Sequence, residues 1–388
     1  MRVMIAGGGT GGHLFPGIAL AEEVATRHPK NTIVFVGTTR GLEARVVPQS
    51  GFTFEPIPSR GLKGMGPLRL VLGLLMLPIS FLSAVRLLLR YKPDVVVGVG
   101  GYSSGPVVMA AFLLRIPTAV QEQNALPGLT NKILGRFVDA VFLTFEDQKH
   151  FFPQKKVHLI GNPIRKKLME NFLRGNAPHE KFTLLVFGGS LGAKGLNSRV
   201  LGALEHLEDL KDQLRFTHQT GKADLPEVKA AYEKRGYDAK VVEFIDDMSA
   251  AYAESELVIC RAGATTIAEL TVAKKASILV PFPFATDDHQ AVNAQSLVQA
   301  GAALMYREAE LDGSKLANEI RALKSDPPRL RKMEKAAGLL GRPEAAKELA
   351  DELVKMMVDR WGGSGRKRSD TSQKLTQQLP EGAKEQRP

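Results

Sequence analysis

Short runs of apolar residues, rich in valine and isoleucine, alternate along the chain with longer stretches that mix apolar and polar positions. Continuous apolar runs are typical of strands buried on both faces of a parallel sheet, and the mixed stretches are typical of the helices that cover it. The pattern therefore predicts a doubly wound α/β protein. The predicted strands are residues 3–6, 32–36, 95–99, 118–120, 140–143, 184–187, 241–244, 257–259 and 277–280.

The strand, glycine loop and helix that open the chain return at residues 181–195. A chain of 388 residues, 44% of them hydrophobic, is too long for one ordinary core and suits two α/β domains. We expect two Rossmann-like domains, residues 1–162 and 163–342, whose parallel sheets face each other across a ligand cleft. An amphipathic helix near residues 343–360 should join the first domain, and the polar tail 361–388 should be disordered.

The net charge of +11 suggests a polyanionic partner, such as nucleic acid, anionic lipid or a phosphorylated ligand. Aromatic residues make up only 6% of the chain and no nucleic-acid-binding signature occurs, so nucleic acid is not expected. The single cysteine, Cys260, excludes an intramolecular disulfide and fits a reducing compartment. The first apolar run is too short for a signal peptide, and we therefore expect a cytoplasmic protein.

Four glycine-containing loops each follow an apolar run and precede a helical stretch. Such loops let backbone N–H groups approach a phosphate, and the following helix adds its positive N-terminus. The first loop matches neither the dinucleotide fingerprint nor a Walker loop. Together the four loops predict ligands that carry several phosphates. They occupy residues 7–12, 98–106, 188–190 and 261–266.

Eight segments, in their order and spacing, resemble the MurG family of bacterial transferases, which make lipid II from lipid I. The resemblance covers about residues 1–357 and implies a GT-B fold with two Rossmann-like halves. It implies an inverting transfer of N-acetylglucosamine from UDP-N-acetylglucosamine to the 4-hydroxyl of a MurNAc-pentapeptide on a polyprenyl pyrophosphate, a step of peptidoglycan synthesis. The segments are 7–16 (GGGTGGHLFP), 100–106 (GGYSSGP), 122–132 (EQNALPGLTNK), 161–165 (GNPIR), 188–197 (GGSLGAKGLN), 244–248 (FIDDM), 261–269 (RAGATTIAE) and 288–294 (DHQAVNA).

The resemblance assigns the two substrate sites residue by residue. Glu269 would grip both ribose hydroxyls, which suits a carboxylate because it can accept two hydrogen bonds at once. The backbone of Ile245 would read the uracil edge, and the helix start at 264–266 would meet the diphosphate. The implied donor-site residues are Thr10, Gly11, Gly12, Asn124, Arg165, Ser190, Ile245, Ala264, Thr265, Thr266, Glu269 and Gln290, and the implied acceptor-site residues are His13, Gly100, Gly101, Tyr102 and Ser103.

Two positions depart from the family pattern. Residue 121 is a glutamine where the family often carries a histidine, so no histidine can act there. The pair His289–Gln290 stands where the family can carry two glutamines. Gln290, with Asn124, therefore keeps the implied contact to the N-acetylglucosamine unit, whereas the contact of residue 289 is in doubt.

The transfer needs a base for the acceptor hydroxyl, and His13 and Glu122 are the candidates. His13 could instead donate to the acceptor diphosphate or cap its own helix, and Glu122 could instead be a scaffold. No cofactor or metal is required in principle, because helix N-termini and Arg165 can stabilise the departing diphosphate; the sequence leaves Mg²⁺ stimulation open. The adjacent acidic pairs 246–247 and 287–288 seldom converge on one ion, and no cysteine–histidine cluster has zinc-ligand spacing.

Residues 70–85 carry no charge and are flanked by basic residues. A membrane span needs about 20 apolar residues, and Pro78 interrupts this shorter run. A buried core helix is an alternative, but we interpret residues 63–92 as an interfacial segment that meets anionic head groups. The protein would then lie peripherally on the cytoplasmic face of the plasma membrane, beside a polyprenyl-linked acceptor and, as the family suggests, other cell-wall synthesis proteins. The basic residues are Lys63, Arg69, Arg86, Arg90 and Lys92.

Four other functions stay open at this point. A GT-B transferase could use another lipid acceptor, such as diacylglycerol, although the acceptor-side segments argue against it. A UDP-N-acetylglucosamine 2-epimerase would convert the nucleotide sugar without any lipid. A nicotinamide oxidoreductase is disfavoured because no acidic residue closes the second strand. A non-catalytic module would bind the nucleotide sugar and transfer nothing.

Overall fold

The computed structural model describes residues 1–59, 67–172, 180–189 and 192–362. The chain divides into two compact units: unit 1 holds Met1–Lys166 with the C-terminal segment from Glu344, and unit 2 holds Lys167–Pro343. The first unit thus ends at Lys166 rather than at residue 162. Residues 363–388 of the expected tail lie outside the described residues.

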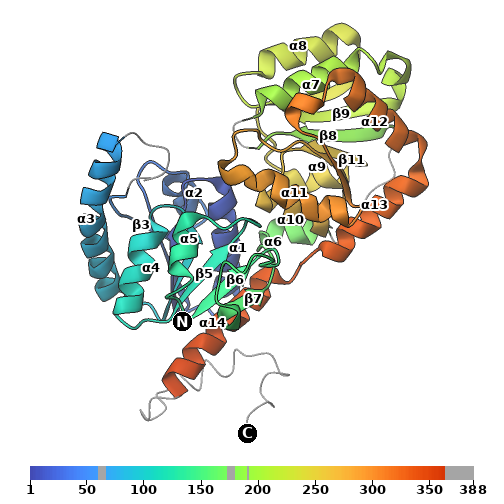
Figure 1. Ribbon diagram of the computed structural model, residues 1–388. Coiled ribbons are helices and arrows are strands. Elements are labelled where there is room, and N and C mark those ends of the chain that lie inside the picture. Colours follow the sequence, from blue (N-terminus) through green and yellow to red (C-terminus); the bar gives the residue numbers. More distant parts are fainter. Residues whose placement is uncertain (60–66, 173–179, 190–191, 363–388) are drawn as a thin grey trace. The chain divides into compact units, whose positions relative to one another are not determined.

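Unit 1 is built on a seven-stranded sheet in which every neighbouring pair is parallel (Figure 1). The strand order is β3-β2-β1-β4-β5-β6-β7, so the chain starts at the centre, runs to one edge and returns to extend the other side. The loops after β1 and β4 therefore lie side by side at the point where the strand order reverses. The strands are β1 (Arg2–Gly7), β2 (Thr32–Gly37), β3 (Thr53–Pro56), β4 (Val95–Gly100), β5 (Thr118–Glu122), β6 (Ala140–Leu143) and β7 (Val157–Leu159).

Side chains alternate between the two faces along each strand, and both sets are apolar, so helices cover both faces of this sheet. Val3 and Ile5 of β1 pack with α1 and α14, whereas Met4 and Ala6 pack with α3, α4 and α5. The helices of unit 1 are α1 (Gly11–Arg27), α2 (Glu43–Gln49), α3 (Pro67–Tyr91), α4 (Ser104–Leu113), α5 (Leu129–Leu134), the 3₁₀ turn η1 (Gln154–Lys156) and α14 (Ala345–Gly362), and α6 (Lys166–Phe172) leads into unit 2.

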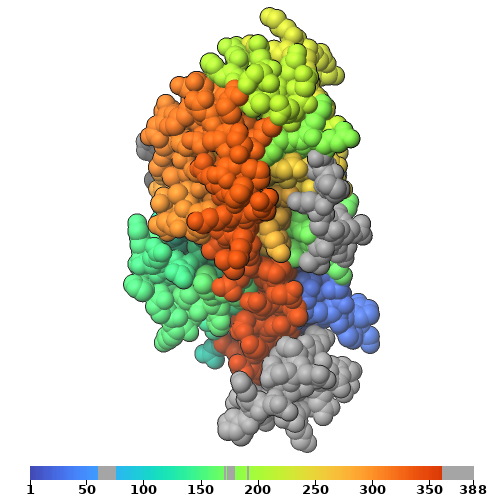
Figure 2. Space-filling view, turned by 90° about the vertical axis from the view of Figure 1, so that its right-hand side faces the viewer, coloured from blue at the N-terminus to red at the C-terminus, as the bar shows by residue number. Residues whose placement is uncertain are grey.

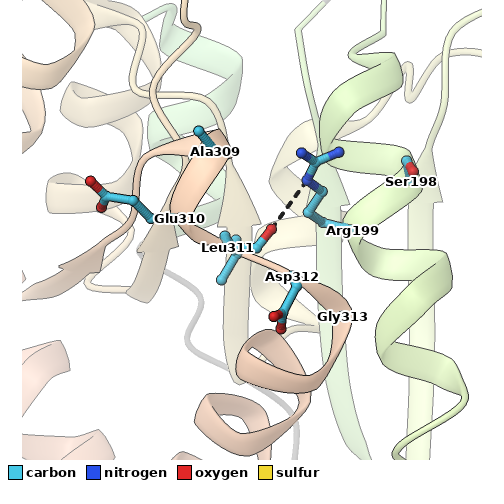
Figure 3. A pocket seen from close by; sticks show the side chains of 7 residues that line it. All are labelled: Ser198, Arg199, Ala309, Glu310, Leu311, Asp312 and Gly313. Atoms are coloured by element: carbon cyan, nitrogen blue, oxygen red, sulfur yellow. Dashed lines mark hydrogen bonds between the residues drawn. The ribbon is translucent and has the colours of Figure 1, made fainter.

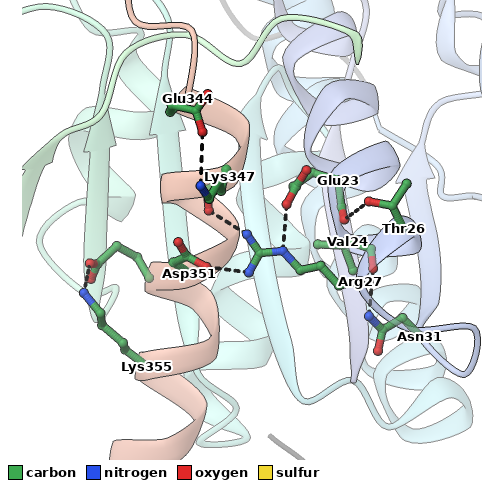
Figure 4. A network of polar contacts seen from close by, with 10 residues as sticks. Glu23, Val24, Thr26, Arg27, Asn31, Glu344, Lys347, Asp351 and Lys355 are labelled. Atoms are coloured by element: carbon green, nitrogen blue, oxygen red, sulfur yellow. Dashed lines mark hydrogen bonds and ion pairs between the residues drawn. The ribbon is translucent and has the colours of Figure 1, made fainter. Parts of the chain in front are cut away.

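The last helix, α14, joins unit 1 through a polar contact as well as an apolar face. Its buried side packs on α1, and its outer side lies at the surface (Figure 2). Arg27 of α1 places Nη1 2.6 Å from Asp351 Oδ1 and Nη2 2.9 Å from the Lys347 carbonyl oxygen, while Nε reaches Glu23 at 2.8 Å (Figure 4). The expected C-terminal helix of the first domain is thus present and tied to α1.

Unit 2 repeats the architecture with six parallel strands in the order β10-β9-β8-β11-β12-β13. The switch point lies between β8 and β11. The strands are β8 (Phe182–Phe187), β9 (Leu214–Gln219), β10 (Asp238–Val242), β11 (Leu257–Cys260), β12 (Ala276–Leu279) and β13 (Ala303–Met305).

Aspartates begin three of the helices of unit 2, because a carboxylate at the N-cap accepts an otherwise unpaired backbone N–H. Asp247 accepts from Ala250, Asp312 from Lys315 and Asp326 from Arg329. The helices are α7 (Lys194–Leu204), η2 (Glu208–Gln213), α8 (Leu225–Arg235), α9 (Met248–Ala253), α10 (Ala264–Val272), η3 (Thr286–Asp288), α11 (His289–Gln299), η4 (Glu308–Glu310), α12 (Gly313–Ser325) and α13 (Pro327–Leu340).

Candidate functional site

The segments singled out from the sequence follow the carboxyl ends of strands in both units. In unit 1 they follow β1, β4, β5 and β7, and in unit 2 they follow β8, β10, β11 and β12. Ligands of doubly wound proteins bind at this edge of the sheet, beside the switch point. The predicted site residues on described segments therefore lie after strand ends, on the side of each sheet where ligands of such folds bind.

The two glycine loops of unit 1 lie in direct backbone contact. The Gly8 N–H donates to the Gly100 carbonyl oxygen at 3.2 Å. A Cβ on Gly7 would lie 2.3 Å from that oxygen, and a Cβ on Gly101 would lie 2.5 Å from the Gly8 carbonyl oxygen. Gly7, Gly100 and Gly101 also have positive φ values. Both loops consequently need glycine for the close approach.

A buried carboxylate, Glu43 of α2, supports the first glycine loop. Its Oε2 accepts from the Gly9 N–H at 2.7 Å, and its Oε1 accepts from the Thr38 N–H at 2.9 Å. A Cβ on Gly8 or Gly37 would collide with this side chain. The Gly9 N–H is therefore bonded within the protein rather than open to a phosphate. Sequence reasoning missed Glu43, because nothing local marks it as buried.

His13 lies in the first turn of α1, after the exposed N-cap residue Thr10 and the first-turn glycines Gly11 and Gly12. Its half-buried ring places Nδ1 2.8 Å from Gln123 Oε1, just beyond β5. A Cβ on Gly100 would lie 2.8 Å from the same Nδ1. The imidazole is thus held by α1, by the end of β4 and by the segment after β5.

The carboxylate of Glu122 is 1% exposed and bonded within its own loop. Oε1 accepts from the Asn124 N–H at 3.0 Å, and Oε2 accepts from the Gly128 N–H at 3.0 Å and from Asn131 Nδ2 at 2.9 Å. A base needs a lone pair open to its substrate. These contacts favour the scaffold alternative for Glu122, with Asn124 held half-buried beside it.

The second glycine loop presents Tyr102 to solvent, with 53% of the residue exposed, next to the half-buried Gly101. Ser103, by contrast, is only 2% exposed at the start of α4. The buried Ser103 could contact an acceptor only after a local rearrangement, whereas Tyr102 is accessible, and the acceptor contacts of this loop stay predictions.

Arg165 lies at the end of unit 1, after the turn that follows β7. Its guanidinium carbon is 4.6 Å from the centroid of the Phe15 ring on α1. Stacking of a guanidinium on an aromatic ring restricts its orientation without neutralising it. Arg165 is half-buried and therefore retains a charged, partly exposed head group.

In unit 2, α10 begins directly after β11, with Ala264, Thr265 and Thr266 in its first turn. The N-cap, Gly263, has no side chain to occupy the helix end. A helix N-terminus attracts anions through its dipole and its backbone N–H groups. The three residues thus occupy the position expected for a diphosphate site.

Glu269 lies one turn further along α10 and is half-buried. Its Oε2 accepts from the Tyr252 hydroxyl at 3.1 Å. Tyr252 is completely buried, between the ring edges of Phe172 and Phe187. Burial, reinforced by the Glu269 charge, raises the pKa of Tyr252 well above its ordinary value, so the hydroxyl stays a donor. Sequence reasoning missed this tyrosine, which reads as an ordinary core residue.

Ile245, which follows β10, is held by a glutamine that the sequence did not single out. Its N–H donates to Gln219 Oε1 at 2.8 Å, and Gln219 Nε2 donates to the Gly189 carbonyl oxygen at 2.8 Å. The Ile245 N–H is therefore used within the protein, which limits the expected uracil contact to the carbonyl oxygen while this bond persists. Gln219 links two of the loops at this edge.

Gln290 lies in the first turn of α11, and its amide is oriented by the backbone. Its Oε1 accepts from the Ala262 N–H at 3.2 Å and from the Phe282 N–H at 2.9 Å. The amide nitrogen is therefore the part that can donate to a sugar hydroxyl. His289 instead turns Nδ1 to the Thr286 carbonyl oxygen at 2.7 Å, a local bond.

The acidic pairs serve the fold. Asp247 caps α9, and Asp288 forms a two-point ion pair with Arg307, with N–O distances of 2.7 and 2.6 Å. Over residues 1–59, 67–172, 180–189 and 192–362, no group of three His, Cys, Asp or Glu side chains is placed to hold a metal ion. Ser190, the remaining predicted donor contact, lies outside the described residues.

A surface pocket of about 300 Å³ lies between α7 and the start of α12 (Figure 3). Arg199 forms part of the pocket wall, and its Nε donates to the Leu311 carbonyl oxygen at 3.1 Å. None of the predicted site residues lines it. The pocket is lined by Ser198, Arg199, Ala309, Glu310, Leu311, Asp312 and Gly313.

The expected interfacial segment forms most of α3. Ala84, Leu87 and Leu88 face the core, whereas Ile79, Leu82 and Leu89 are more than half exposed. One face of the helix is therefore buried in the core and the opposite face is apolar and exposed, while the interfacial role stays a prediction. Among the helices that the structure describes, none is long and apolar enough to cross a bilayer. Lys63 and the side chain of Arg69 lie outside the described residues.

Exposed apolar side chains continue onto α4, which neighbours α3, and onto α5, which neighbours α4 (Figure 1). The Phe112 and Phe137 rings lie 5.7 Å apart, and Leu113 and Ile133 are exposed beside them in the sequence. Unit 1 thus presents an apolar surface over α3, α4 and α5, which we call the apolar face. Its exposed members are Leu77, Ile79, Leu82, Leu89, Phe112, Leu113, Leu114, Leu129, Ile133 and Phe137.

Comparison with known proteins places this geometry in a family. Residues 3–143 match the N-terminal domain and residues 183–351 the C-terminal domain of glycosyltransferase family 28. The chain is 66% identical over 369 residues to the UDP-N-acetylglucosamine–N-acetylmuramyl-(pentapeptide) pyrophosphoryl-undecaprenol N-acetylglucosamine transferase of Myxococcus xanthus (strain DK1622), covering 95% of this chain and 96% of the relative.

Two solved structures are similar in fold. The crystal structure of Acinetobacter baumannii MurG has a TM-score of 0.74 at 31% identity and covers 91% of this chain and 99% of its own. A UDP-GlcNAc 2-epimerase from Neisseria meningitidis has a TM-score of 0.65 at 16% identity, over 92% of this chain and all of its own, and shares the fold alone. The predicted GT-B class is confirmed. The chain belongs to glycosyltransferase family 28, among the UDP-N-acetylglucosamine–N-acetylmuramyl-(pentapeptide) pyrophosphoryl-undecaprenol N-acetylglucosamine transferases.

Proposed function

We propose that the protein transfers N-acetylglucosamine from UDP-N-acetylglucosamine to the 4-hydroxyl of the N-acetylmuramyl-pentapeptide of lipid I, which yields lipid II. The observation that carries the proposal is the placement of the family's segments. Those on described residues follow the carboxyl ends of the parallel strands, with the glycine loops in unit 1 and the α10 N-terminus with Glu269 in unit 2.

The proposed reaction is one displacement at the anomeric carbon of the donor. The acceptor oxygen forms a bond to that carbon while the bond between the carbon and the UDP oxygen breaks, and the configuration inverts. The hydroxyl proton passes to a base, and the negative charge passes to the departing diphosphate. His13 is our proposed base, because its ring is partly exposed while the Glu122 carboxylate is already bonded.

The departing charge is stabilised by preorganised dipoles in this proposal. The first turn of α10 directs its positive end at the diphosphate, and Arg165 supplies a guanidinium whose orientation is restricted by Phe15. These groups perform the task that a metal ion performs in other transferases. The proposal therefore requires no cofactor, and addition of a chelator should leave turnover intact.

We further propose that unit 1 binds the cytoplasmic face of the plasma membrane through the apolar face. Exposed leucine, isoleucine and phenylalanine side chains suit the boundary of the hydrocarbon region, and Arg86, Arg90 and Lys92 lie at the end of α3 for contact with anionic head groups. The pyrophosphate of an acceptor whose polyprenyl tail lies in the bilayer would then reach the glycine loops of unit 1.

A transfer assay tests the function. Purified protein is given UDP-N-acetylglucosamine with a labelled sugar and vesicles that contain lipid I, and we expect label in lipid II. Vesicles with diacylglycerol in place of lipid I test whether the protein uses another lipid acceptor. Conversion of the nucleotide sugar without any lipid would indicate an epimerase. Label on diacylglycerol alone, or epimerisation without transfer, would overturn the proposal.

Replacing Glu269 by alanine should raise the KM for UDP-N-acetylglucosamine. A hydrogen bond to a charged group contributes about 1.5–3 kcal/mol, so loss of even one ribose bond predicts a rise of about tenfold to hundredfold. Titration with UDP in a calorimeter measures the same loss directly. The exposed Glu227 on α8 provides the matched control, since Glu227→Ala should bind UDP like the parent protein. Equal UDP affinity in the two variants would contradict the assignment.

Tyr252→Phe tests the group that holds Glu269. Loss of the hydroxyl removes one contact that orders the carboxylate, and the entropy of ordering a glutamate predicts UDP binding weaker by about three- to tenfold. Calorimetric titration of Tyr252→Phe, Glu269→Ala and the double variant separates this effect from general damage. The double variant should bind no more weakly than Glu269→Ala alone, because the tyrosine acts through the glutamate. Additive losses would show an independent effect.

A further inference from the structure

A chain of buried amide side chains leads from His13 into unit 1. Gln123 is 1% exposed, and its Nε2 donates to the Val99 carbonyl oxygen at 2.9 Å and to Gln121 Oε1. Gln121 Nε2 donates in turn to Asn162 Oδ1 at 3.1 Å. All three amides are buried. The active-site edge of the sheet therefore contains a directional hydrogen-bond chain.

The direction of this chain is fixed at Val99. A backbone carbonyl oxygen can only accept, so the Gln123 amide must direct its nitrogen to Val99 and its oxygen to His13. An amide oxygen can also only accept, and the His13 nitrogen at 2.8 Å must therefore donate. Since a neutral imidazole has one N–H, the proton of His13 resides on Nδ1 and the lone pair on Nε2.

We propose that Gln123 is a positioning residue that holds His13 as the Nδ1–H tautomer, so that Nε2 is the nitrogen that accepts the acceptor's hydroxyl proton. This inference rests on the proposed function. During transfer, Nε2 takes the proton as the acceptor oxygen bonds to the anomeric carbon and UDP leaves. The resulting imidazolium keeps its Nδ1–H bond to Gln123 Oε1.

The surroundings of the ring support the same orientation. Gly100 has φ of +92°, and a Cβ there would lie 2.8 Å from His13 Nδ1, so the absent side chain leaves space for the ring edge. Gln121, in turn, uses its amide inside the protein and faces no substrate, because it is 1% exposed and bonded to Gln123 and Asn162. Its contribution is to support Gln123 from the side away from His13.

The test measures the tautomer itself, without substrate. Protein with ¹⁵N-labelled histidine is examined by long-range ¹H–¹⁵N correlation at alkaline pH, where the signal of His13 is assigned by its loss in His13→Gln from among the eight histidines. We expect the Nδ1–H pattern in the parent protein. An Nε2–H pattern would overturn the inference, whatever the transfer assay shows, because the pattern is read on the parent protein and the variant serves only to assign the signal.

Two variants extend the test to turnover. Gln123→Met has a similar shape but offers Nδ1–H only a weak thioether acceptor, so it should weaken the Nδ1–H preference and reduce kcat by at least about tenfold, as expected when a catalytic imidazole adopts the wrong tautomer. The KM for UDP-N-acetylglucosamine should change less than about twofold, because Glu269 and the α10 N-terminus, which are proposed to hold its uridine diphosphate, lie in unit 2. Gln121→Leu removes a neighbouring amide but leaves the Val99 bond, so it should retain the Nδ1–H pattern. A Gln123→Met protein with parental tautomer and kcat would contradict the role of Gln123.

Discussion

His13→Ala should transfer N-acetylglucosamine about 10²–10⁴-fold more slowly than the parent protein, the range expected for removal of a well-placed general base. The imidazole is held by α1, by Gly100 and by Gln123, yet His13 is partly exposed at the carboxyl edge of the sheet. A group that is oriented by the protein and open on one side suits proton transfer to a substrate. The same geometry does not suit a helix cap, because Nδ1 bonds to a residue beyond β5.

The kinetic parameters separate the two active roles left open for His13. A base contributes only in the transition state, so kcat should fall while the KM values for lipid I and for the nucleotide sugar stay within about threefold. A residue that binds the acceptor pyrophosphate would instead raise the KM for lipid I. Steady-state assays with each substrate varied in turn measure both. The exposed His206 in unit 2 supplies a control, since His206→Ala should keep parental kinetics.

The sequence predicted the class of fold because its central strands are continuous apolar runs. Strands β1, β4, β6 and β11 lie where such runs were found. Strand β9 was missed because it ends in Thr217, His218 and Gln219, which are polar although buried. Strand β10 was placed too late in the chain, since its side chains are only half-buried and give a weak apolar signal.

The predicted site residues belong to local motifs, but the residues that orient them do not. Glu43 and Gln219 each lie far along the chain from the loops that they bond, Gly9 and Ile245 respectively. Gln123 is adjacent to a predicted residue, yet its importance depends on the Val99 carbonyl oxygen of another strand. Such contacts arise only when parallel strands bring their ends together, so no pattern along the chain marks them.

Acid should destabilise unit 2 through one buried histidine, His218 of β9. Its Nδ1 lies 3.1 Å from the Tyr232 hydroxyl on α8, and its Nε2 lies 3.1 Å from Asn197 Oδ1 on α7. Asn197 Nδ2 donates to the Thr220 carbonyl oxygen, which directs its oxygen to the ring. The histidine thus joins three elements beside the donor site as a neutral ring, and it is completely buried.

Burial lowers the pKa of His218 from its ordinary 6.5 to about 3. Between pH 6.5 and about pH 3 this histidine is protonated in the unfolded chain but neutral in the folded protein, so the free energy of unfolding falls as the pH falls. Above pH 6.5 the ring is neutral in both states and contributes no pH dependence. The loss should reach about 3 kcal/mol at pH 4.5 and about 5 kcal/mol near pH 3, at 1.36 kcal/mol for each unit of pH.

Hydrogen exchange of peptides from β9 and α8, followed from pH 6.5 to 4.5, measures this loss within unit 2 alone. The carboxylates of Asp238, Asp247 and Asp288 have lowered pKa values because of their hydrogen-bonded partners, so they titrate mostly below this window. His218→Gln cannot titrate, so its free energy of unfolding should depend less steeply on pH, by the slope that corresponds to about one bound proton. The exposed His206→Gln should keep the parental slope. If His218→Gln kept the parental slope, the acid sensitivity of unit 2 would arise from another group.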